Sequence, residues 1–235
     1  KTEKEAVSLF SGDFSLKKPL IIIGSGSNIL FIRDFDGTII TSDIKGIRVS
    51  EKSENSVVVS AGSGIVWDDL VAWCVNKGFT GIENLSLIPG KTGAAPVQNI
   101  GAYGVEAKDF IIKVKAVSTF DGTVRYFTKN ECEFAYRDSV FKKYEKNKYL
   151  VTRVWFRLST RGEFRLNYGA LSEEVLKLGQ PTAEKVRAAV IKIRSEKLPD
   201  PSVLGNAGSF FKNPVIKENL ADELVLKFPG MVQYP

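Results

Sequence analysis

The middle of the sequence decides how the rest is interpreted: residues 88–104 read Ile-Pro-Gly-Lys-Thr-Gly-Ala-Ala-Pro-Val-Gln-Asn-Ile-Gly-Ala-Tyr-Gly. Four glycines, three alanines and two prolines fall within these seventeen residues. A segment with so few bulky side chains is either disordered or pressed against something large and flat. Disorder usually accompanies high charge, and Lys91 is the only charged residue here. We therefore expect close backbone contact with a ligand, with Gln98 and Asn99 presenting amide groups to a polar ring edge. A purely structural loop is the alternative.

Three further segments combine small residues with isolated polar ones. Residues 24–28 read Gly-Ser-Gly-Ser-Asn and can form an anion-binding nest, although an ordinary turn explains them equally well. In Phe-Ala-Tyr-Arg-Asp-Ser, residues 134–139, the arginine Arg137 either holds a carboxylate or oxyanion or forms a surface pair with the acid after it. In Gly-Asn-Ala-Gly-Ser-Phe-Phe-Lys-Asn-Pro, residues 205–214, Ser209 either donates a proton or belongs to a capped turn.

Composition narrows the chemistry that the chain can perform. Its 235 residues are 43% hydrophobic and 26% charged, as in ordinary globular proteins, and this length suggests one or two domains. They contain no histidine, which excludes a Ser-His-Asp triad and a histidine-ligated metal within them. The two cysteines, Cys74 and Cys132, are expected to be buried thiols in a reducing cytoplasm.

Charge and hydropathy also bear on the partners of the chain. The net charge of +6 either attracts anionic ligands such as nucleotides or only solvates the surface. The cations are spread along the chain, so we expect no nucleic-acid partner. The first residues, 1–6, do not resemble a signal peptide, and the apolar runs are too short to span a bilayer, so we expect no membrane association.

Local patterns predict a mixture of strands and helices. Strands are predicted at residues 20–23, 38–41, 57–60 and, half exposed, 149–159, with a further extended stretch at 28–32. A hairpin is predicted from the β-rich runs 111–119 and 124–128, which Asp121-Gly122 joins. Helices are predicted at 67–77, ended by Gly78, and from an N-cap at Thr182 through Arg194. We therefore predict an α+β fold, with Pro199 and Pro201 marking a domain boundary.

In their order and spacing, the four segments resemble the UDP-N-acetylenolpyruvoylglucosamine reductase family, over about residues 20–213. The resemblance implies a two-part FAD-binding unit of the vanillyl-alcohol-oxidase type, followed by a substrate domain. We expect FAD-binding subdomain 1 at 1–45, FAD-binding subdomain 2 at 46–196, and the start of an incomplete substrate-binding domain at 197–235.

The resemblance also implies a role for individual residues. Those expected to bind FAD are Gly24, Ser25, Gly26, Ser27, Asn28, Pro89, Gly90, Gly93, Gln98, Asn99, Gly101, Ala102, Tyr103, Gly104 and Arg194. Those expected to bind the UDP-sugar or the nicotinamide cofactor are Tyr168, Lys197 and Asn213. Those expected to be catalytic are Arg137 and Ser209. No metal is expected.

The activity implied is NADPH-dependent, FAD-mediated reduction of an enolpyruvyl UDP-sugar to UDP-N-acetylmuramate, in peptidoglycan precursor synthesis, by a cytoplasmic monomer. NADPH gives a hydride to FAD N5, and the hydride then passes to the terminal vinyl carbon. Arg137 would stabilise the negative charge that develops beside it. Ser209 would protonate the neighbouring carbon, with Lys197 or Lys212 favouring its alkoxide.

One departure from the family concerns a catalytic glutamate that pairs with the arginine. Family members continue well past Pro235 and supply it there, whereas Glu218 and Glu223 lie too close behind Ser209 to match it. We therefore expect the 235-residue chain to bind FAD but to turn over poorly. Two other functions remain open: a different flavin oxidase or dehydrogenase on the same scaffold, and a non-catalytic nucleotide-binding module.

Overall fold

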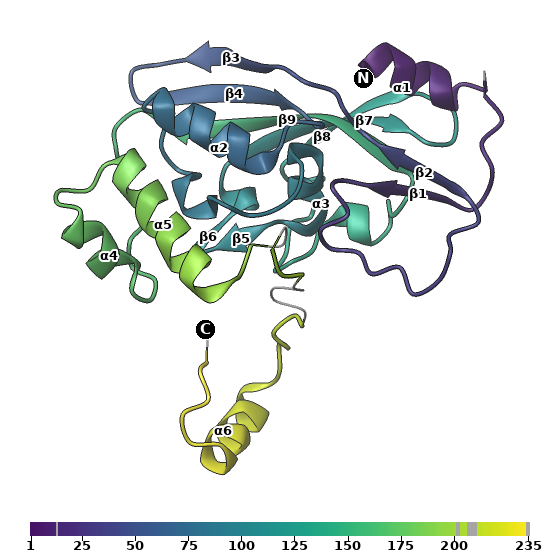
Figure 1. Ribbon diagram of the computed structural model, residues 1–235. Helices are drawn as coiled ribbons and strands as arrows, with labels where there is room; N and C mark the ends of the chain where they lie inside the picture. The colour runs from purple at the N-terminus through teal and green to yellow at the C-terminus, as the bar shows by residue number, and fades with distance from the viewer. Residues whose placement is uncertain (13, 201–202, 206–210, 234–235) are drawn as a thin grey trace. The chain divides into compact units, whose positions relative to one another are not determined.

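The computed structural model describes residues 1–12, 14–200, 203–205 and 211–233. The chain divides into two compact units, Lys1–Gly205 and Asn206–Pro235. In its described part, the second unit has one helix, α6 (Glu218–Lys227). The first unit contains the sheets and the other helices (Figure 1).

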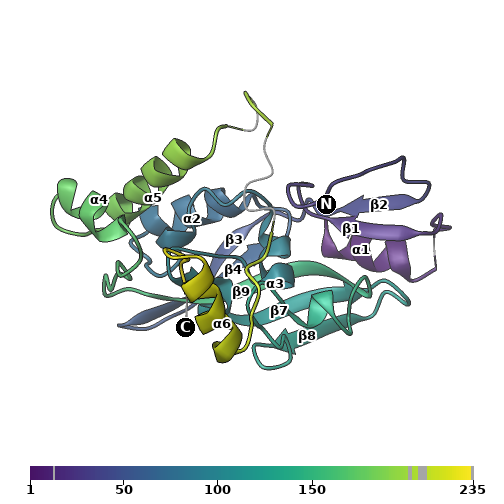
Figure 2. The same cartoon turned by 90° about the horizontal axis from the view of Figure 1, so that it is seen from below.

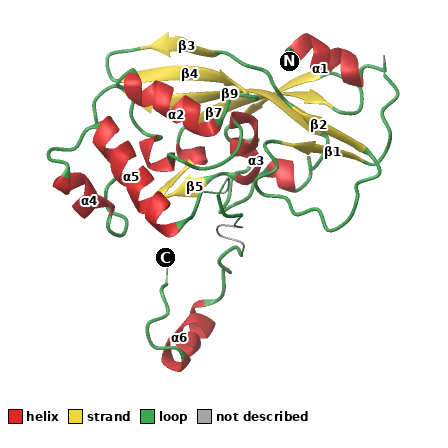
Figure 3. Ribbon diagram, in the orientation of Figure 1, coloured by secondary structure: helices red, strands yellow, loops and turns green. Residues whose placement is uncertain are grey.

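The first unit is built on a five-stranded antiparallel sheet with the strand order β3-β4-β9-β7-β8 (Figure 3). Its strands are β3 (Ile47–Lys52), β4 (Ser56–Gly62), β7 (Ile111–Ser118), β8 (Val124–Thr128) and β9 (Tyr149–Ser159). Along β9, Val154 and Phe156 are buried whereas Arg157 is exposed, so the alternation in the sequence sets which face of the strand packs inward. Strand β4 is buried on both faces, which its run of valines permits.

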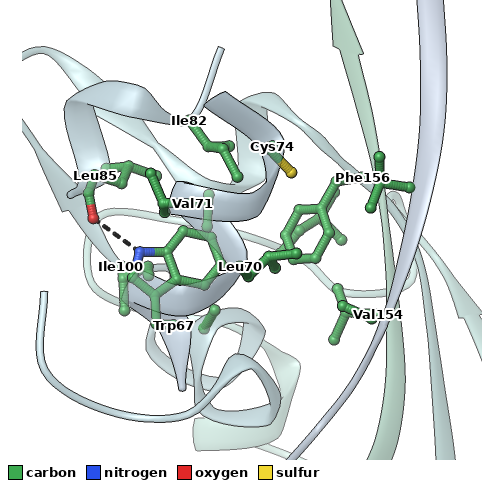
Figure 4. Close-up of a cluster of buried hydrophobic side chains, with 14 of the residues drawn as sticks. Trp67, Leu70, Val71, Cys74, Ile82, Leu85, Ile100, Val154 and Phe156 are labelled. Atoms are coloured by element: carbon green, nitrogen blue, oxygen red, sulfur yellow. Dashed lines mark hydrogen bonds between the residues drawn. The ribbon is translucent and has the colours of Figure 1, made fainter. Parts of the chain in front are cut away.

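Helix α2 (Trp67–Asn76) packs on one face of this sheet and supplies the largest fully buried side chain among the described residues, that of Trp67. Trp67 is buried against Phe156, with ring centroids 5.7 Å apart, and its Nε1 donates to the Leu85 carbonyl oxygen over 2.8 Å (Figure 4). The helix ends at Gly78, where φ is 71°, and Phe79 N then donates back to a carbonyl in the last turn. This is a Schellman motif, which glycine stabilises because it has no Cβ.

A smaller second cluster covers the opposite face of the sheet. Helix α1 (Glu3–Phe10) begins with a capping box between Thr2 and Glu5 and buries Phe10 against Val117 and Leu150. The cluster also includes Ile40 of a separate two-stranded parallel sheet, formed by β1 (Leu20–Ile23) and β2 (Thr38–Thr41). Helix α1 therefore joins the two sheets (Figure 2).

The first unit has five further helices and strands in its described part. They are the short α3 (Ala95–Gln98), the β-hairpin of β5 (Gly101–Ala102) and β6 (Val105–Glu106), and the helices α4 (Leu171–Lys177) and α5 (Ala183–Lys197). The described residues also include four 3-10 turns: η1 (Glu83–Leu85), η2 (Thr92–Ala94), η3 (Ala107–Asp109) and η4 (Val140–Lys142). Thr182 caps α5 through the N–H of Lys185. Helices α4 and α5 bury their apolar faces against each other.

The α+β fold, the hairpin of β7 and β8, helix α2 and the Thr182 cap are confirmed, and both cysteines are buried free thiols. The extended stretch predicted at residues 28–32 is wrong, because all five residues lie outside any strand. Their apolar side chains have no sheet to join: Leu30 is 73% exposed and Ile32 is 87% exposed. Among the described residues, we find no helix with the length and apolar character needed to cross a membrane.

Candidate active site

Residues 24–28 turn the chain at the end of β1. Gly26 has a φ of 76°, a left-handed conformation that glycine adopts without strain. Thr41, the last residue of β2, fixes the start of the turn because its Oγ1 donates to the Gly24 carbonyl oxygen over 3.0 Å. Within the described part of the chain, the backbone N–H groups of residues 25–28 donate to no protein acceptor, so they remain available to an anion.

A second segment lies directly against this turn. Asn28 Nδ2 donates to Gln98 Oε1 over 2.7 Å, although the two residues are 70 positions apart. A methyl group added to Gly24 would lie 3.4 Å from Ala94 Cβ, and one added to Gly90 would lie 3.7 Å from Ser27 Oγ. The structure therefore places residues 24–28 beside the segment that begins with the exposed Pro89.

The segment after Pro89 is an ordered turn and helix rather than an open loop. Lys91 Nζ donates to Thr41 Oγ1 over 3.0 Å and to the Ser42 carbonyl oxygen over 2.7 Å. A methyl group on Gly93 would lie only 2.6 Å from Ser63 Cβ, so packing alone requires glycine there. Part of the small-residue composition thus has a structural cause. This agrees with the alternative interpretation of the sequence, in which the segment is a purely structural loop.

The segment then continues into the hairpin of β5 and β6. Gly101 pairs with Glu106 across the two strands. The two turn residues, Tyr103 and Gly104, have φ values of 48° and 74°. Two consecutive left-handed residues make the turn that best matches the twist of a two-residue hairpin. Its register places the Glu106 side chain next to a residue that has none.

The Arg137 guanidinium lies in the space that a side chain at Gly101 would fill. Its Nη2 donates to the Gly101 carbonyl oxygen over 2.6 Å, and its Nη1 lies 3.5 Å from Glu106 Oε1. A methyl group on Gly101 would lie 2.5 Å from Arg137 Nη1, so the missing side chain makes room for the guanidinium. Asp138 pairs instead with Lys143, at 3.1 Å, so the alternative of a surface pair between Arg137 and Asp138 is wrong.

Tyr168 and Arg194 gather at the turn of the hairpin. The rings of Tyr103 and Tyr168 meet edge to face, with centroids 6.0 Å apart, and a methyl group on Gly104 would lie 3.6 Å from Tyr168 Cβ. Burial raises the pKa of Tyr103 and outweighs the lowering effect of the Arg194 guanidinium. The Nε of Arg194 is buried with no hydrogen-bond partner in the described residues, so this N–H is available to a ligand.

The three remaining predicted site residues are Lys197, Asn213 and Ser209. Lys197 is exposed at the last position of α5. Asn213 is exposed and belongs to the second unit. Ser209, the predicted proton donor, lies outside the described residues.

Asn99 has a different role from the one its side chain was predicted to have. It is fully buried, and its Nδ2 donates to the Ala135 carbonyl oxygen over 2.9 Å and to Glu106 Oε2 over 3.2 Å. Its Oδ1 accepts the Lys108 N–H over 2.9 Å. These partners occupy the amide, and the Asn99 backbone N–H donates to the Ala95 carbonyl oxygen, so the described contacts of this residue are all to the protein itself.

Glu106 is the residue near Arg137 that sequence reasoning missed. It follows the glycine-rich segment without belonging to it, and nothing in its own neighbourhood marks it. The signal that finds it is register: a two-residue turn at Tyr103-Gly104 must pair residue 101 with residue 106.

Comparison with known proteins gives consistent relationships. Residues 13–128 match the FAD binding domain family. Over 223 residues, 95% of the chain, the sequence is 46% identical to a UDP-N-acetylenolpyruvoylglucosamine reductase of Bacteroides fragilis, of which it covers 67%. It is 47% identical over 219 residues to the protein of that name from Pseudomonas aeruginosa, covering 92% of this chain and 64% of that one.

A solved structure agrees at the level of the fold. The crystal structure of UDP-N-acetylenolpyruvylglucosamine reductase from Thermus caldophilus superposes with a TM-score of 0.60 at 24% sequence identity, covering 96% of this chain and 71% of that one. The chain spans between 62% and 68% of the length of the curated relatives it matches.

Proposed function

Because the chain belongs to the UDP-N-acetylenolpyruvoylglucosamine reductase family, we propose that its protein reduces the enolpyruvyl ether of a UDP-sugar to a lactyl ether with NADPH and FAD. The product is UDP-N-acetylmuramate, a precursor of peptidoglycan, and we place the reaction in the cytoplasm with a monomeric enzyme. We propose the same domain limits as before: FAD-binding subdomains at 1–45 and 46–196, and the start of the substrate-binding domain at 197–235.

The described residues fit two chemically distinct parts of FAD, its pyrophosphate and its flat ring system. The four unpaired N–H groups of residues 25–28 suit a pyrophosphate, and the orphaned Nε of Arg194 suits the same anion. Gly24 and Gly90 carry no side chain where the two segments meet, and the nearest atoms to an added methyl group would be Ala94 Cβ at 3.4 Å and Ser27 Oγ at 3.7 Å, so no bulky group stands between the segments. When bound, FAD supplies hydride transfer from NADPH to the vinyl carbon of the substrate.

Arg137 is proposed to act on the charge that the reduction creates. Hydride addition to the terminal vinyl carbon leaves negative charge on the neighbouring carbon and its carboxylate. A guanidinium already held in place stabilises that charge without reorganising at the moment of reaction. Its planar fork of N–H groups also matches the carboxylate geometry.

The other predicted residues complete the proposal. Ser209 donates a proton to the carbon beside the carboxylate, which yields the lactyl ether. Tyr168, Lys197 and Asn213 hold the UDP-sugar or the nicotinamide cofactor. The observation that carries the proposal is the position of Arg137, whose guanidinium lies 2.6 Å from the Gly101 carbonyl oxygen in the segment assigned to FAD.

The proposal is tested on a chain of the relatives' full length, loaded with FAD. NADPH is expected to reduce the flavin, and the enolpyruvyl UDP-sugar, rather than oxygen, to reoxidise it. Arg137→Ala and Ser209→Ala should each slow reoxidation by the sugar nucleotide by roughly 10²- to 10³-fold. Flavin reduction by NADPH should survive Ser209→Ala, because that step needs no proton at the substrate carbon.

The outcomes separate the alternatives. Reoxidation by oxygen but not by the sugar nucleotide would indicate a different flavin oxidase. Equal slowing of both half-reactions in Ser209→Ala would contradict the role given to that serine. Full turnover by the 235-residue chain alone would refute the expectation that it binds FAD but turns over poorly.

A further inference from the structure

The Glu106 carboxylate stands at the centre of a small charged cluster beside Arg137. Its Oε1 lies 3.5 Å from Arg137 Nη1, and its Oε2 lies 2.6 Å from Lys108 Nζ. The Glu106 side chain is 20% exposed, so solvent weakens these contacts less than on an open surface. Two cations and one anion leave a net positive charge, and this charge can attract the carboxylate of a substrate.

Asn99 connects this carboxylate to the turn that carries Arg137. One amide group donates both to Glu106 Oε2, over 3.2 Å, and to the Ala135 carbonyl oxygen, over 2.9 Å. Ala135 and Asp138 exchange two backbone hydrogen bonds of 3.1 Å, so the residues between them form a closed two-residue turn. The hairpin and the arginine turn are thus held to each other by a fully buried side chain.

The backbone of Arg137 needs such support. Its φ of 53° is a left-handed conformation that a residue with a long side chain rarely adopts. Lys142 Nζ holds the Arg137 carbonyl oxygen over 2.9 Å from the far side of the turn. With the backbone fixed in this way, the guanidinium is held by three contacts: the Gly101 carbonyl oxygen, the Glu106 carboxylate and the face of the Tyr136 ring, whose centroid lies 5.1 Å from Arg137 Cζ. Of these, the Glu106 carboxylate is the only one with a charge opposite to that of the arginine.

We propose that Glu106 is a positioning residue, which holds the Arg137 guanidinium over Gly101 in the orientation needed to receive the substrate carboxylate. This inference rests on the proposed function for its role in catalysis, but not for the contact itself. Glu106 has no direct contact with the substrate in this scheme. It acts by limiting the orientations of Arg137, while Lys108 keeps it from neutralising the arginine completely.

Two measurements on the full-length, FAD-loaded protein test the proposal with Glu106→Gln. The first is the NMR order parameter of the Arg137 Nε–H, assigned by its loss in Arg137→Lys. It should fall from a rigid value toward about 0.6 or below in Glu106→Gln. The matched control is Asp138→Asn, which removes a carboxylate from the same turn without touching the guanidinium, and it should leave the order parameter unchanged.

The second measurement is a double-mutant cycle on reoxidation of the flavin by the enolpyruvyl UDP-sugar. Glu106→Gln should slow this step by roughly 10- to 100-fold in the wild-type background, as loss of a supporting residue commonly does. It should have no further effect in an Arg137→Ala background, because the residue through which it acts is gone. Flavin reduction by NADPH should stay unchanged, which a general structural role would not allow.

The two measurements separate failure of this inference from failure of the proposed function. An unchanged order parameter, an unaffected rate of reoxidation, or an equal loss of rate in the Arg137→Ala background would each overturn the positioning role. If the wild-type protein does not reduce the sugar nucleotide at all, the proposed function is wrong, and the order parameter still decides whether Glu106 fixes Arg137.

Discussion

Replacing Gly101 by alanine tests whether the position of Arg137 matters for the reaction. Gly101 does not have the left-handed φ that would itself exclude a side chain, so alanine is acceptable to the backbone. The new methyl group would lie 2.5 Å from Arg137 Nη1 and 3.0 Å from both Glu106 Cγ and the Val105 carbonyl oxygen. The closest of these contacts involves the free end of a flexible side chain, which can move.

The structure sets the size of that movement. Ordinary contact begins at 3.4 Å, so the guanidinium must withdraw by about 0.9 Å from a methyl group at 2.5 Å. A withdrawal of this size from Gly101 is enough to stretch or break the 2.6 Å hydrogen bond from Arg137 Nη2 to the carbonyl oxygen. Misplacement of a catalytic group by about 1 Å can lower a rate by roughly 10²-fold. We therefore expect reduction of the enolpyruvyl UDP-sugar to slow by about that factor.

Stability should change much less. A lost hydrogen bond destabilises the fold by about 1 kcal/mol, whereas Gly→Ala at a permissive position regains roughly 0.4–1 kcal/mol from the unfolded chain. Stopped-flow measurements give the rate of flavin reduction by NADPH and the rate of reoxidation by the sugar nucleotide, and thermal unfolding gives the stability. Substrate reduction at the wild-type rate would refute the reasoning. So would equal slowing of flavin reduction by NADPH, because that step does not use Arg137.

Three other substitutions have different expected outcomes. Gly93→Ala places a methyl group 2.6 Å from Ser63 Cβ in the interior, and it should lower the free energy of unfolding by about 1–3 kcal/mol; wild-type stability in urea would contradict the packing argument. Arg187→Ala removes two hydrogen bonds of 2.6 and 2.7 Å to Asp68, and should lower stability by about 2 kcal/mol and the melting temperature by roughly 4–8 °C. Burial raises the pKa of Asp68, but the Arg187 contacts, the Leu87 N–H and the Arg194 charge together outweigh burial and lower it. The stabilisation therefore exists above pH 3.8, and the difference in stability from wild type should narrow as the pH falls through the folded-state pKa. Burial raises the pKa of Glu83 above 4.5, so the wild-type protein loses stability as the pH rises from that value through the folded-state pKa. The glutamine of Glu83→Gln cannot ionise. Over that pH range the free energy of unfolding of the variant should therefore rise relative to that of wild type by up to about 1.4 kcal/mol per pH unit. A stability difference that is the same at pH 4, 6 and 8 would contradict this.

Local chemistry in the sequence was sufficient for several elements of the fold. The apolar run before Gly24 predicted β1, and helical spacing with Gly78 behind it predicted α2. Asp121-Gly122 predicted the hairpin because turn chemistry is a local property, although the connection in the structure is the longer loop of residues 119–123 rather than a two-residue turn. Residues 28–32 were mispredicted because β-branched composition makes a strand only where a partner strand exists, and the sequence does not show partners.

The candidate site was predictable in its members but not in its contacts. Composition pointed to residues 24–28 and 88–104, yet the hydrogen bond from Asn28 to Gln98 depends on how segments 70 positions apart pack. Arg137 was identified from its neighbours in sequence, which suggested Asp138 as its partner. Its actual partner, Glu106, lies across a hairpin whose register follows from two left-handed residues.

The glycines of residues 88–104 show why composition alone could not separate ligand contact from packing. Gly93 has Ser63 Cβ 2.6 Å from its missing side chain, whereas at Gly90 the nearest atom is the Ser27 hydroxyl oxygen at 3.7 Å. The first glycine is required by the interior of the protein and the second faces the turn assigned to the FAD pyrophosphate. Gly101 combines the two cases, because what fills the space of its missing side chain is the guanidinium of Arg137. A glycine of this third kind leaves room for a neighbouring side chain, which here is the one proposed to receive the substrate carboxylate.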